Sequence, residues 1–218
     1  MPLENDRWVV GEDPRAKDIV VGVIHYDAAK TTKGGLDYLQ SVDKNASVSA
    51  SYNAYVGDGK SYMLLDPAKY RAWHSGKSSI TIDGTEYKNV NGVSIGIAVR
   101  NAGFSAKREG PFSVAAPIPS TGDMVYWEPY EDSDIHELAS LCVKMERKLG
   151  RKIPWVGHQD VSRGRKFDPG PLFPWDLFYR TLAGSRLMDT AKPEAEVLRH
   201  LVHAQDMVVG TTKMDAIL

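Results

Sequence analysis

The sequence predicts an α/β protein in which a mixed central β-sheet is flanked by helices. Short apolar runs rich in β-branched residues, typical of buried strands, are separated by segments whose apolar residues recur every three or four positions, as they do in helices. The two kinds of segment are mixed along the 218 residues without strict strand–helix alternation. This pattern favours one sheet with helices packed against it.

The first half of the chain contains most of the predicted strands. Residues 18–24 form a nearly continuous β-branched run that stops at His25. In the segment 50–65, two strand-like runs flank Gly57-Asp58-Gly59, and an Asp-Gly turn in this setting predicts a β-hairpin. The elements expected here are a polar lead-in (1–17), a strand (18–24), a short amphipathic helix (34–44), the hairpin (50–65) and a strand (93–99).

The second half begins with residues 101–131, where glycines and prolines recur, so we expect a long irregular loop. Residues 132–149 have apolar residues at three- and four-residue steps and predict the longest helix. Cys142 lies on its apolar stripe, so we interpret it as an inert core thiol rather than a nucleophile. The remaining expected elements are a strand (154–157) and two helices (174–182 and 193–205).

Composition argues against several classes of function. The chain has 27 Lys+Arg and 28 Asp+Glu, a formal net charge of -1, so no global charge attracts nucleic acid or an anionic membrane. One cysteine excludes an internal disulfide and a multi-cysteine zinc site. The acidic, polar start lacks a secretion signal, and no apolar run reaches the roughly 18 residues of a membrane span. We therefore expect a cytoplasmic protein with no nucleic-acid partner and no membrane insertion.

Two of the six histidines directly follow predicted strands, where a sheet edge presents side chains to a cleft. These are His25 and His158, and Asp168 follows shortly after His158, just before the stiff turn Pro169-Gly170-Pro171. Catalytic zinc sites typically use three His or carboxylate ligands and keep one position open. His25, His158 and Asp168 are therefore a candidate zinc set. The alternative is that the basic residues 163–166 and Asp168 form a structural salt-bridge loop.

The other histidines are weaker candidates. His136-Glu137 resembles the start of an H-E-x-x-H zinc motif, but Ser140 stands where the second histidine is required. His200 and His203 lie three residues apart on the predicted C-terminal helix, and we interpret them as part of a solvated face.

Five segments, in chain order, resemble those of the zinc-dependent type 2 N-acetylmuramoyl-L-alanine amidases, which share the peptidoglycan-recognition-protein fold. They are the strand ending in His25, the hairpin over 51–65, Arg71-Ala72-Trp73-His74-Ser75-Gly76, Ser94-Ile95-Gly96-Ile97, and the stretch from His158 to Pro171. The resemblance implies that fold and a catalytic domain over residues 18–183. The lead-in 1–17 precedes it, and residues 184–218 are expected to be a helical extension outside the family core.

The resemblance also implies chemistry. Zinc ligands are expected at His25, His158 and Asp168, with one Zn²⁺ per chain, and a catalytic lysine at Lys166. The implied reaction is hydrolysis of the amide bond between N-acetylmuramic acid and the first L-alanine of the stem peptide. Bound zinc lowers the pKa of a water and polarises the scissile carbonyl, while a nearby ammonium stabilises the oxyanion that develops.

One position departs from the family pattern. Many members carry a glutamate after Ser-Ile-Gly-Ile, where this chain has Ala98. Another branch uses a tyrosine from the hairpin strand, which makes Tyr52 a candidate catalytic residue. Trp73 and His74 are expected to line the cleft as substrate contacts or as partners of the metal ligands, the alternative being packing that closes a loop.

The leading hypothesis is a bacteriolytic phage endolysin that degrades the cell wall, and a cytosolic amidase that recycles muropeptides fits the missing secretion signal equally well. A hypothesis of a different class is a non-catalytic or weakly catalytic peptidoglycan-binding module on the same fold, motivated by Ala98. In each case the expected partner is peptidoglycan or a muropeptide.

Overall fold

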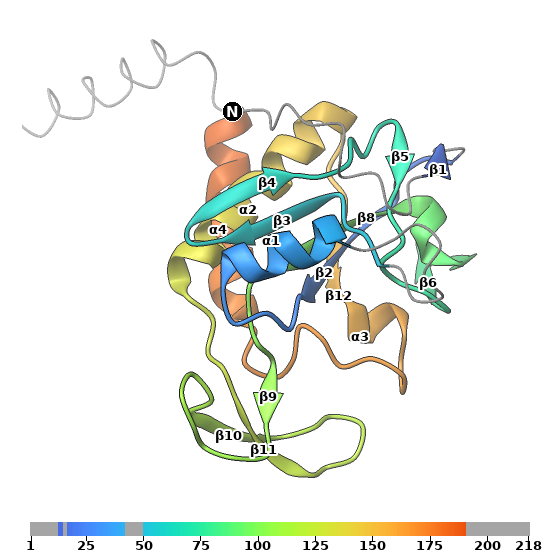
Figure 1. Ribbon diagram of the computed structural model, residues 1–218. Helices are drawn as coiled ribbons and strands as arrows, with labels where there is room; N and C mark the ends of the chain where they lie inside the picture. Colours follow the sequence, from blue (N-terminus) through green and yellow to red (C-terminus); the bar gives the residue numbers. More distant parts are fainter. Residues whose placement is uncertain (1–12, 15–16, 42–49, 191–218) are drawn as a thin grey trace, which may run out of the picture.

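The computed structural model describes residues 13–14, 17–41 and 50–190. A five-stranded sheet with the order β12-β2-β8-β3-β4 forms its centre (Figure 1). Four strands run parallel, and the edge strand β4 is antiparallel to β3. The predicted α/β class with a mixed central sheet is confirmed. The strands are β2 (Val21–Tyr26), β3 (Ala54–Gly57), β4 (Lys60–Met63), β8 (Ser94–Val99) and β12 (Trp155–Gly157).

Helices cover both faces of this sheet. Two long helices, α2 (Asp132–Leu149) and α4 (Trp175–Thr190), pack together on one face. The helix α1 (Thr32–Ser41) lies on the other side, against β3, and the short helix α3 (His158–Val161) directly follows β12 (Figure 1). None of the described helices is long and apolar enough to cross a membrane.

Alternation along β2 divides its side chains between the two faces, because successive strand residues point to opposite sides. Ile24 packs into the main core with α2 and α4, whereas Val21 and Val23 belong to a smaller cluster on the opposite face. His25 follows the same alternation, so its side chain points to the face that carries α3. The prediction that the strand stops at His25 needs correction, because β2 continues through Tyr26.

The helix α2 has the predicted bounds, 132–149, and its apolar stripe is buried as expected. Its left-handed C-cap, Gly150 with φ 69°, donates its N–H to carbonyl groups of the last turn. Cys142 is completely buried in the core, and this burial raises the pKa of its thiol well above the usual range. The interpretation of Cys142 as an inert core residue agrees with both observations.

Residues 101–131 differ from the expected irregular loop. They contain β9 (Phe104–Ser105), β10 (Val114–Pro117) and β11 (Met124–Trp127), which form a small antiparallel sheet apart from the central one (Figure 1). The ring of Phe104 lies 5.0 Å from that of Trp127, so an aromatic contact holds the strands together. Strands of two to four residues between glycines and prolines are too short to produce a recognisable alternating pattern.

The segment between β4 and β8 also contains elements that we did not expect. A hairpin of β6 (Ser79–Ile82) and β7 (Thr85–Lys88) turns at Asp83-Gly84, the same signal that predicts the hairpin at residues 50–65. A 3₁₀-helix, η1 (Val90–Val93), then leads into β8. The two-residue strands β1 (Asp13–Pro14) and β5 (Tyr70–Arg71) pair with each other.

The C-terminal part is described as far as residue 190. The helix predicted over 174–182 is longer than expected and runs to Thr190 as α4. The helix predicted over 193–205, with His200 and His203, lies outside the described residues, as does most of the lead-in 1–17. The division of the chain into a domain at 18–183 and an extension at 184–218 stays a prediction.

Candidate metal centre and its surroundings

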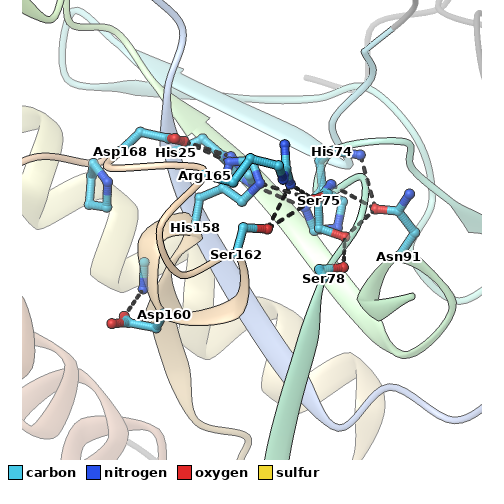
Figure 2. A network of polar contacts seen from close by, with 12 residues as sticks. His25, His74, Ser75, Ser78, Asn91, His158, Asp160, Ser162, Arg165 and Asp168 are labelled. Carbon is cyan, nitrogen blue, oxygen red and sulfur yellow. Dashed lines mark hydrogen bonds and ion pairs between the residues drawn. The ribbon is translucent and has the colours of Figure 1, made fainter. Parts of the chain in front are cut away.

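His25, His158 and Asp168 meet at the carboxyl end of the parallel strands (Figure 2). The strand β12 pairs with β2 so that Gly157 lies opposite Ile24, and the next residue of each strand is a histidine. The Nδ1 atoms of His25 and His158 lie 2.9 and 3.0 Å from Oδ2 of Asp168. All three residues are buried, and one potential ligand atom from each lies within 4.8 Å of the others.

The electrostatics of this cluster favour the protonation states in which His25 and Asp168 bind metal ions. Burial lowers the pKa of His25 to about 4, against the opposing effect of the Asp168 carboxylate. Burial works in the other direction on Asp168, but the close approach of the His158 and His25 rings holds its pKa below the usual range. Neutral imidazole and ionised carboxylate are the forms that coordinate a metal.

A series of hydrogen bonds behind His25 favours a proton on its Nε2 atom. The hydroxyl of Ser94 donates to the carbonyl of Val90 (2.7 Å), so its oxygen accepts from Nε2–H of His74 (2.8 Å). Nδ1 of a neutral His74 is then an acceptor, and Nε2–H of His25 donates to it (2.9 Å). The Nδ1 lone pair of His25 therefore points to the cluster and is available to a metal.

A different partner orients His158. Its Nε2–H donates to the carbonyl of Ser75 (3.1 Å), which leaves its Nδ1 directed at Asp168. The loop that carries Ser75 is held by Asn91, whose side-chain oxygen accepts from the N–H groups of His74 (3.1 Å) and Ser75 (2.7 Å). Both candidate histidine ligands thus have their second nitrogen engaged, which is the usual arrangement around a metal.

The donor set fits zinc. Two imidazole nitrogens and one carboxylate are a typical set of protein ligands in catalytic zinc sites, and they are ligands that zinc prefers. The hydrogen-bonded partners of the two rings, His74 and the Ser75 carbonyl, hold them in the tautomer that coordination through Nδ1 requires. The described residues could therefore hold one metal ion at this place.

The sequence model of the N-acetylmuramoyl-L-alanine amidase family (Amidase_2) matches residues 15–171, which include the whole cluster. The chain belongs to this family.

Known relatives agree with this assignment. The N-acetylmuramoyl-L-alanine amidase AmiD of Escherichia coli (strain K12) is 30% identical over 176 residues, which are 79% of this chain and 55% of AmiD. The structure of E. coli AmiD in complex with the substrate anhydro-N-acetylmuramic acid-L-Ala-D-γ-Glu-L-Lys superposes with a TM-score of 0.55 at 27% identity, covering 78% of this chain and 60% of that one. This chain therefore spans little more than half of the AmiD protein.

A second solved structure shows the likeness of fold. It is AmpDh3 from Pseudomonas aeruginosa in complex with anhydromuramic pentapeptide, with a TM-score of 0.55 and 22% identity. The match covers 91% of this chain and 78% of AmpDh3. The amidase type 2 fold expected from the sequence is confirmed.

The other site residues expected from the sequence differ in how deeply they are buried. Tyr52 lies just before β3, and its ring is 5.1 Å from that of His25. Lys166 is exposed, and its positive charge is one of those that lower the pKa of His25. Trp73 is partly buried, while its neighbour His74 is buried behind His25 rather than facing the solvent.

Ala98 occupies the position at which many family members have a glutamate. It is completely buried and lies opposite His25 on one side and Tyr55 on the other. Residues opposite each other in neighbouring strands point to the same face, so the Ala98 methyl group faces the metal-centre side of the sheet. This position therefore supplies no carboxylate to the metal centre, and Tyr52 remains the candidate catalytic residue near His25.

Sequence reasoning missed the residues that hold the ligands in place. The residues are Ser75, Asn91 and Ser94. Their positions in the sequence form no recognisable motif, and serine and asparagine are common in surface loops. Ser94 and Ser75 do lie in segments that carry the family resemblance, Ser94-Ile95-Gly96-Ile97 and the loop 71–76, but their contacts become visible only in three dimensions. His136, set aside in the sequence, lies exposed on α2 with Nδ1 3.1 Å from the hydroxyl of Thr181.

Proposed function

We propose that this chain is a zinc-dependent amidase that hydrolyses the bond between N-acetylmuramic acid and L-alanine in peptidoglycan or muropeptides. The observation that carries the proposal is the convergence of buried His25, His158 and Asp168 in a member of the N-acetylmuramoyl-L-alanine amidase family, with the pKa values of His25 and Asp168 both below their usual range. The substrate named in the AmiD complex, a muramic acid joined to L-alanine, contains the bond in question.

In the proposed hydrolysis, the residues around the metal centre have different roles. His25, His158 and Asp168 hold the zinc ion, which when bound supplies a Lewis acid for the amide carbonyl and lowers the pKa of a water. In this proposal the ammonium of Lys166, whose charge acts on His25, stabilises negative charge that develops on the carbonyl oxygen. His74 keeps the proton of His25 on Nε2, away from the metal.

Tyr52 acts in this proposal as a hydrogen-bond donor. Burial and the nearby Asp168 raise the pKa of its phenol above the usual value, so the hydroxyl keeps its proton at neutral pH. A protonated phenol beside His25 orients a water or the substrate carbonyl by donating a hydrogen bond. With alanine at position 98, a carboxylate base of the kind found in many relatives is not supplied by this strand.

The test is direct. Purified protein with one equivalent of zinc is incubated with a soluble muropeptide and with intact cell-wall sacculi, and new L-alanine amino termini are measured by mass spectrometry. We expect L-alanine amino termini to appear, a chelator to abolish this cleavage and added zinc to restore it. The variant His158→Ala should lose both the bound metal and the cleavage. Failure to cleave either substrate with zinc bound would refute the proposal.

The choice of substrate also separates two biological settings. A phage endolysin must act on intact sacculi, whereas a recycling amidase acts on soluble anhydromuropeptides. The soluble anhydromuropeptide named in the AmiD complex favours the second setting, and we propose the endolysin role as the alternative. The two substrates are compared at equal concentration of stem peptides. Cleavage of sacculi that is faster than cleavage of the soluble muropeptide would favour the endolysin.

A non-catalytic peptidoglycan-binding module is a second candidate, and Ala98 is the observation that favours it. A binding module needs no metal, so the two candidates differ in their zinc content. Stoichiometric zinc in the purified protein supports the enzyme, and binding to sacculi without zinc or turnover supports the module.

A further inference from the structure

A groove with a volume of about 1080 Å³ lies between the β6–β7 hairpin and the segment 160–165. One wall is formed by residues 77–81 and by Lys88 and Asn89, and the other by α3 and the loop after it. None of the three candidate metal ligands lines this groove. It is thus a separate concave surface that the proposed chemistry does not use.

The groove concentrates positive charge. Four of its lining residues are cationic, Lys77, Lys88, Arg163 and Arg165, and a single one, Asp160, is anionic. The chain as a whole has a formal net charge of -1, so this excess is local. A concave surface with one sign of charge attracts ligands of the opposite sign more strongly than scattered surface charges do.

Some of these charges already have partners within the protein. The carboxylate of Asp160 accepts the N–H of Gly157 (2.8 Å), at the start of α3. The guanidinium of Arg165 donates to the carbonyl groups of Ser75 (2.5 Å) and Lys77 (3.1 Å), so it is fixed in the wall. The ammonium of Lys88 lies 3.5 Å from Glu86 on the exposed surface of the hairpin.

Two cations face the groove without such a partner. Lys77 and Arg163 are both exposed, and within the described residues no carboxylate lies at ion-pairing distance from either side chain. One stands on each wall, and the exposed Thr81 also lines the groove. A ligand that enters the groove therefore meets two available positive charges.

The groove and the metal centre share one structural group. The carbonyl oxygen of Ser75 accepts hydrogen bonds from Nε2 of His158 on the metal side and from Arg165 in the groove wall (Figure 2). Ser162, which also lines the groove, donates to the same carbonyl (3.2 Å). A polymer bound at the metal centre would accordingly have its neighbouring units close to the groove.

We propose that this groove binds the carboxylates of a second peptide stem of peptidoglycan while the stem to be cleaved lies at the metal centre. The inference rests on the proposed amidase function. A stem of the composition L-Ala-D-γ-Glu-L-Lys has a free carboxylate on its γ-linked glutamate and another at its end. Guanidinium and ammonium groups pair with carboxylates, and a polymer offers several stems where a soluble muropeptide offers one.

The experiment compares a polymeric substrate with a single stem. The variant Lys77→Glu/Arg163→Glu reverses both available charges, and Lys60→Glu/Lys152→Glu reverses two exposed lysines outside the groove as a matched control. Each protein is assayed on sacculi from which phosphate polymers have been removed and on a soluble single-stem muropeptide. We expect the ratio of sacculus to muropeptide kcat/KM to fall about tenfold in the groove variant, equivalent to about 1.4 kcal/mol, and to stay level in the control.

Co-sedimentation of each protein with the same sacculi gives a readout that needs no turnover. Binding of the parent protein should weaken with added salt, because salt screens exposed charges, and the groove variant should bind less at low salt. Equal ratios and equal binding for groove and control variants would overturn the proposal, as would a difference seen only on sacculi that retain phosphate polymers. If the parent protein cleaves neither substrate, the amidase function fails, and co-sedimentation alone decides the groove.

Discussion

Nε2 of His25 lies 2.9 Å from Nδ1 of His74, so that one buried histidine holds the ring of another. The contact joins β2 to a loop that is far away in sequence. Two further hydrogen bonds continue the series, from His74 to the Ser94 hydroxyl and from that hydroxyl to the carbonyl of Val90. Each donor in this series of hydrogen bonds has a defined acceptor, which favours the tautomer of His25 that carries its proton on Nε2. His74, expected from the sequence to line the cleft, is in this way linked to the metal centre from behind.

We predict that His74→Phe weakens zinc binding by about 10- to 100-fold, because Nε2–H of His25 loses its acceptor. His74→Asn, which offers a side-chain oxygen near the position of Nδ1, should restore part of the affinity. Competition with a chromophoric chelator measures the zinc affinity, and thermal unfolding of the zinc-free proteins checks that each is folded. Identical zinc affinity for the Phe, Asn and parent proteins would show that the contact has no role in metal binding.

Gly96 should be sensitive for the same reason. A Cβ atom at this position would lie 2.4 Å from Cγ of His74, closer than packed atoms can approach. We expect Gly96→Ala to displace His74 and to lower zinc affinity in the direction of His74→Phe. Gly92→Ala is the matched control, since a Cβ atom there would meet only Lys17 at 4.0 Å. An unaltered affinity in Gly96→Ala would mean that the ring moves aside without consequence.

The stability of the sheet depends on a close contact between Gly22 and Trp155, which lie opposite each other on β2 and β12. A Cβ atom at Gly22 would lie 2.0 Å from the indole ring of the buried Trp155. We predict that Gly22→Ala lowers the free energy of unfolding by about 1–3 kcal/mol, as overpacking of a core does. Urea denaturation measures the effect. In Gly22→Ala/Trp155→Leu the two costs should not add, and strict additivity would contradict the proposed clash.

The elements that the sequence predicts well are those with a strong period. The 132–149 helix has a continuous apolar stripe, and the strands around Gly22 and Ile97 are apolar runs whose residues are almost all buried. The small sheet within 101–131 was not predicted, because its strands have two to four residues and depend on the packing of Phe104 against Trp127. Such contacts between distant residues leave no local pattern.

The candidate metal ligands could be predicted because position and residue type coincide. A histidine at the carboxyl end of each of two parallel strands, and an aspartate soon afterwards, is a restricted pattern. The supporting residues could not be predicted in the same way. Ser75 acts through its main-chain carbonyl, which any residue type supplies, and Asn91 acts through contacts with a loop about 16 residues away.

Cys142 provides a test of the core through its chemistry. Burial raises the pKa of its thiol, so at any pH below that raised value it carries less of the reactive thiolate than an unfolded cysteine does. We expect alkylation of the native protein at about pH 8, near the ordinary thiol pKa, to be far slower than alkylation in denaturant. At each pH at which the fold persists, the native reaction should stay slower than the reaction of the denatured protein. Rapid native modification would place Cys142 outside the core.

Lys166 is the residue whose role in the reaction is most open to a decisive test. It is exposed and contributes positive charge at the metal centre, but it is no ligand, so Lys166→Ala should retain stoichiometric zinc. If its ammonium stabilises the oxyanion, kcat should fall by about 10²- to 10³-fold with little change in KM, because the interaction forms only in the transition state. Lys166→Arg keeps the charge and should recover part of the rate. The matched control is Lys152→Ala, an exposed lysine away from the site. Turnover of Lys166→Ala equal to that of the control would remove Lys166 from the mechanism and leave Tyr52 as the candidate donor.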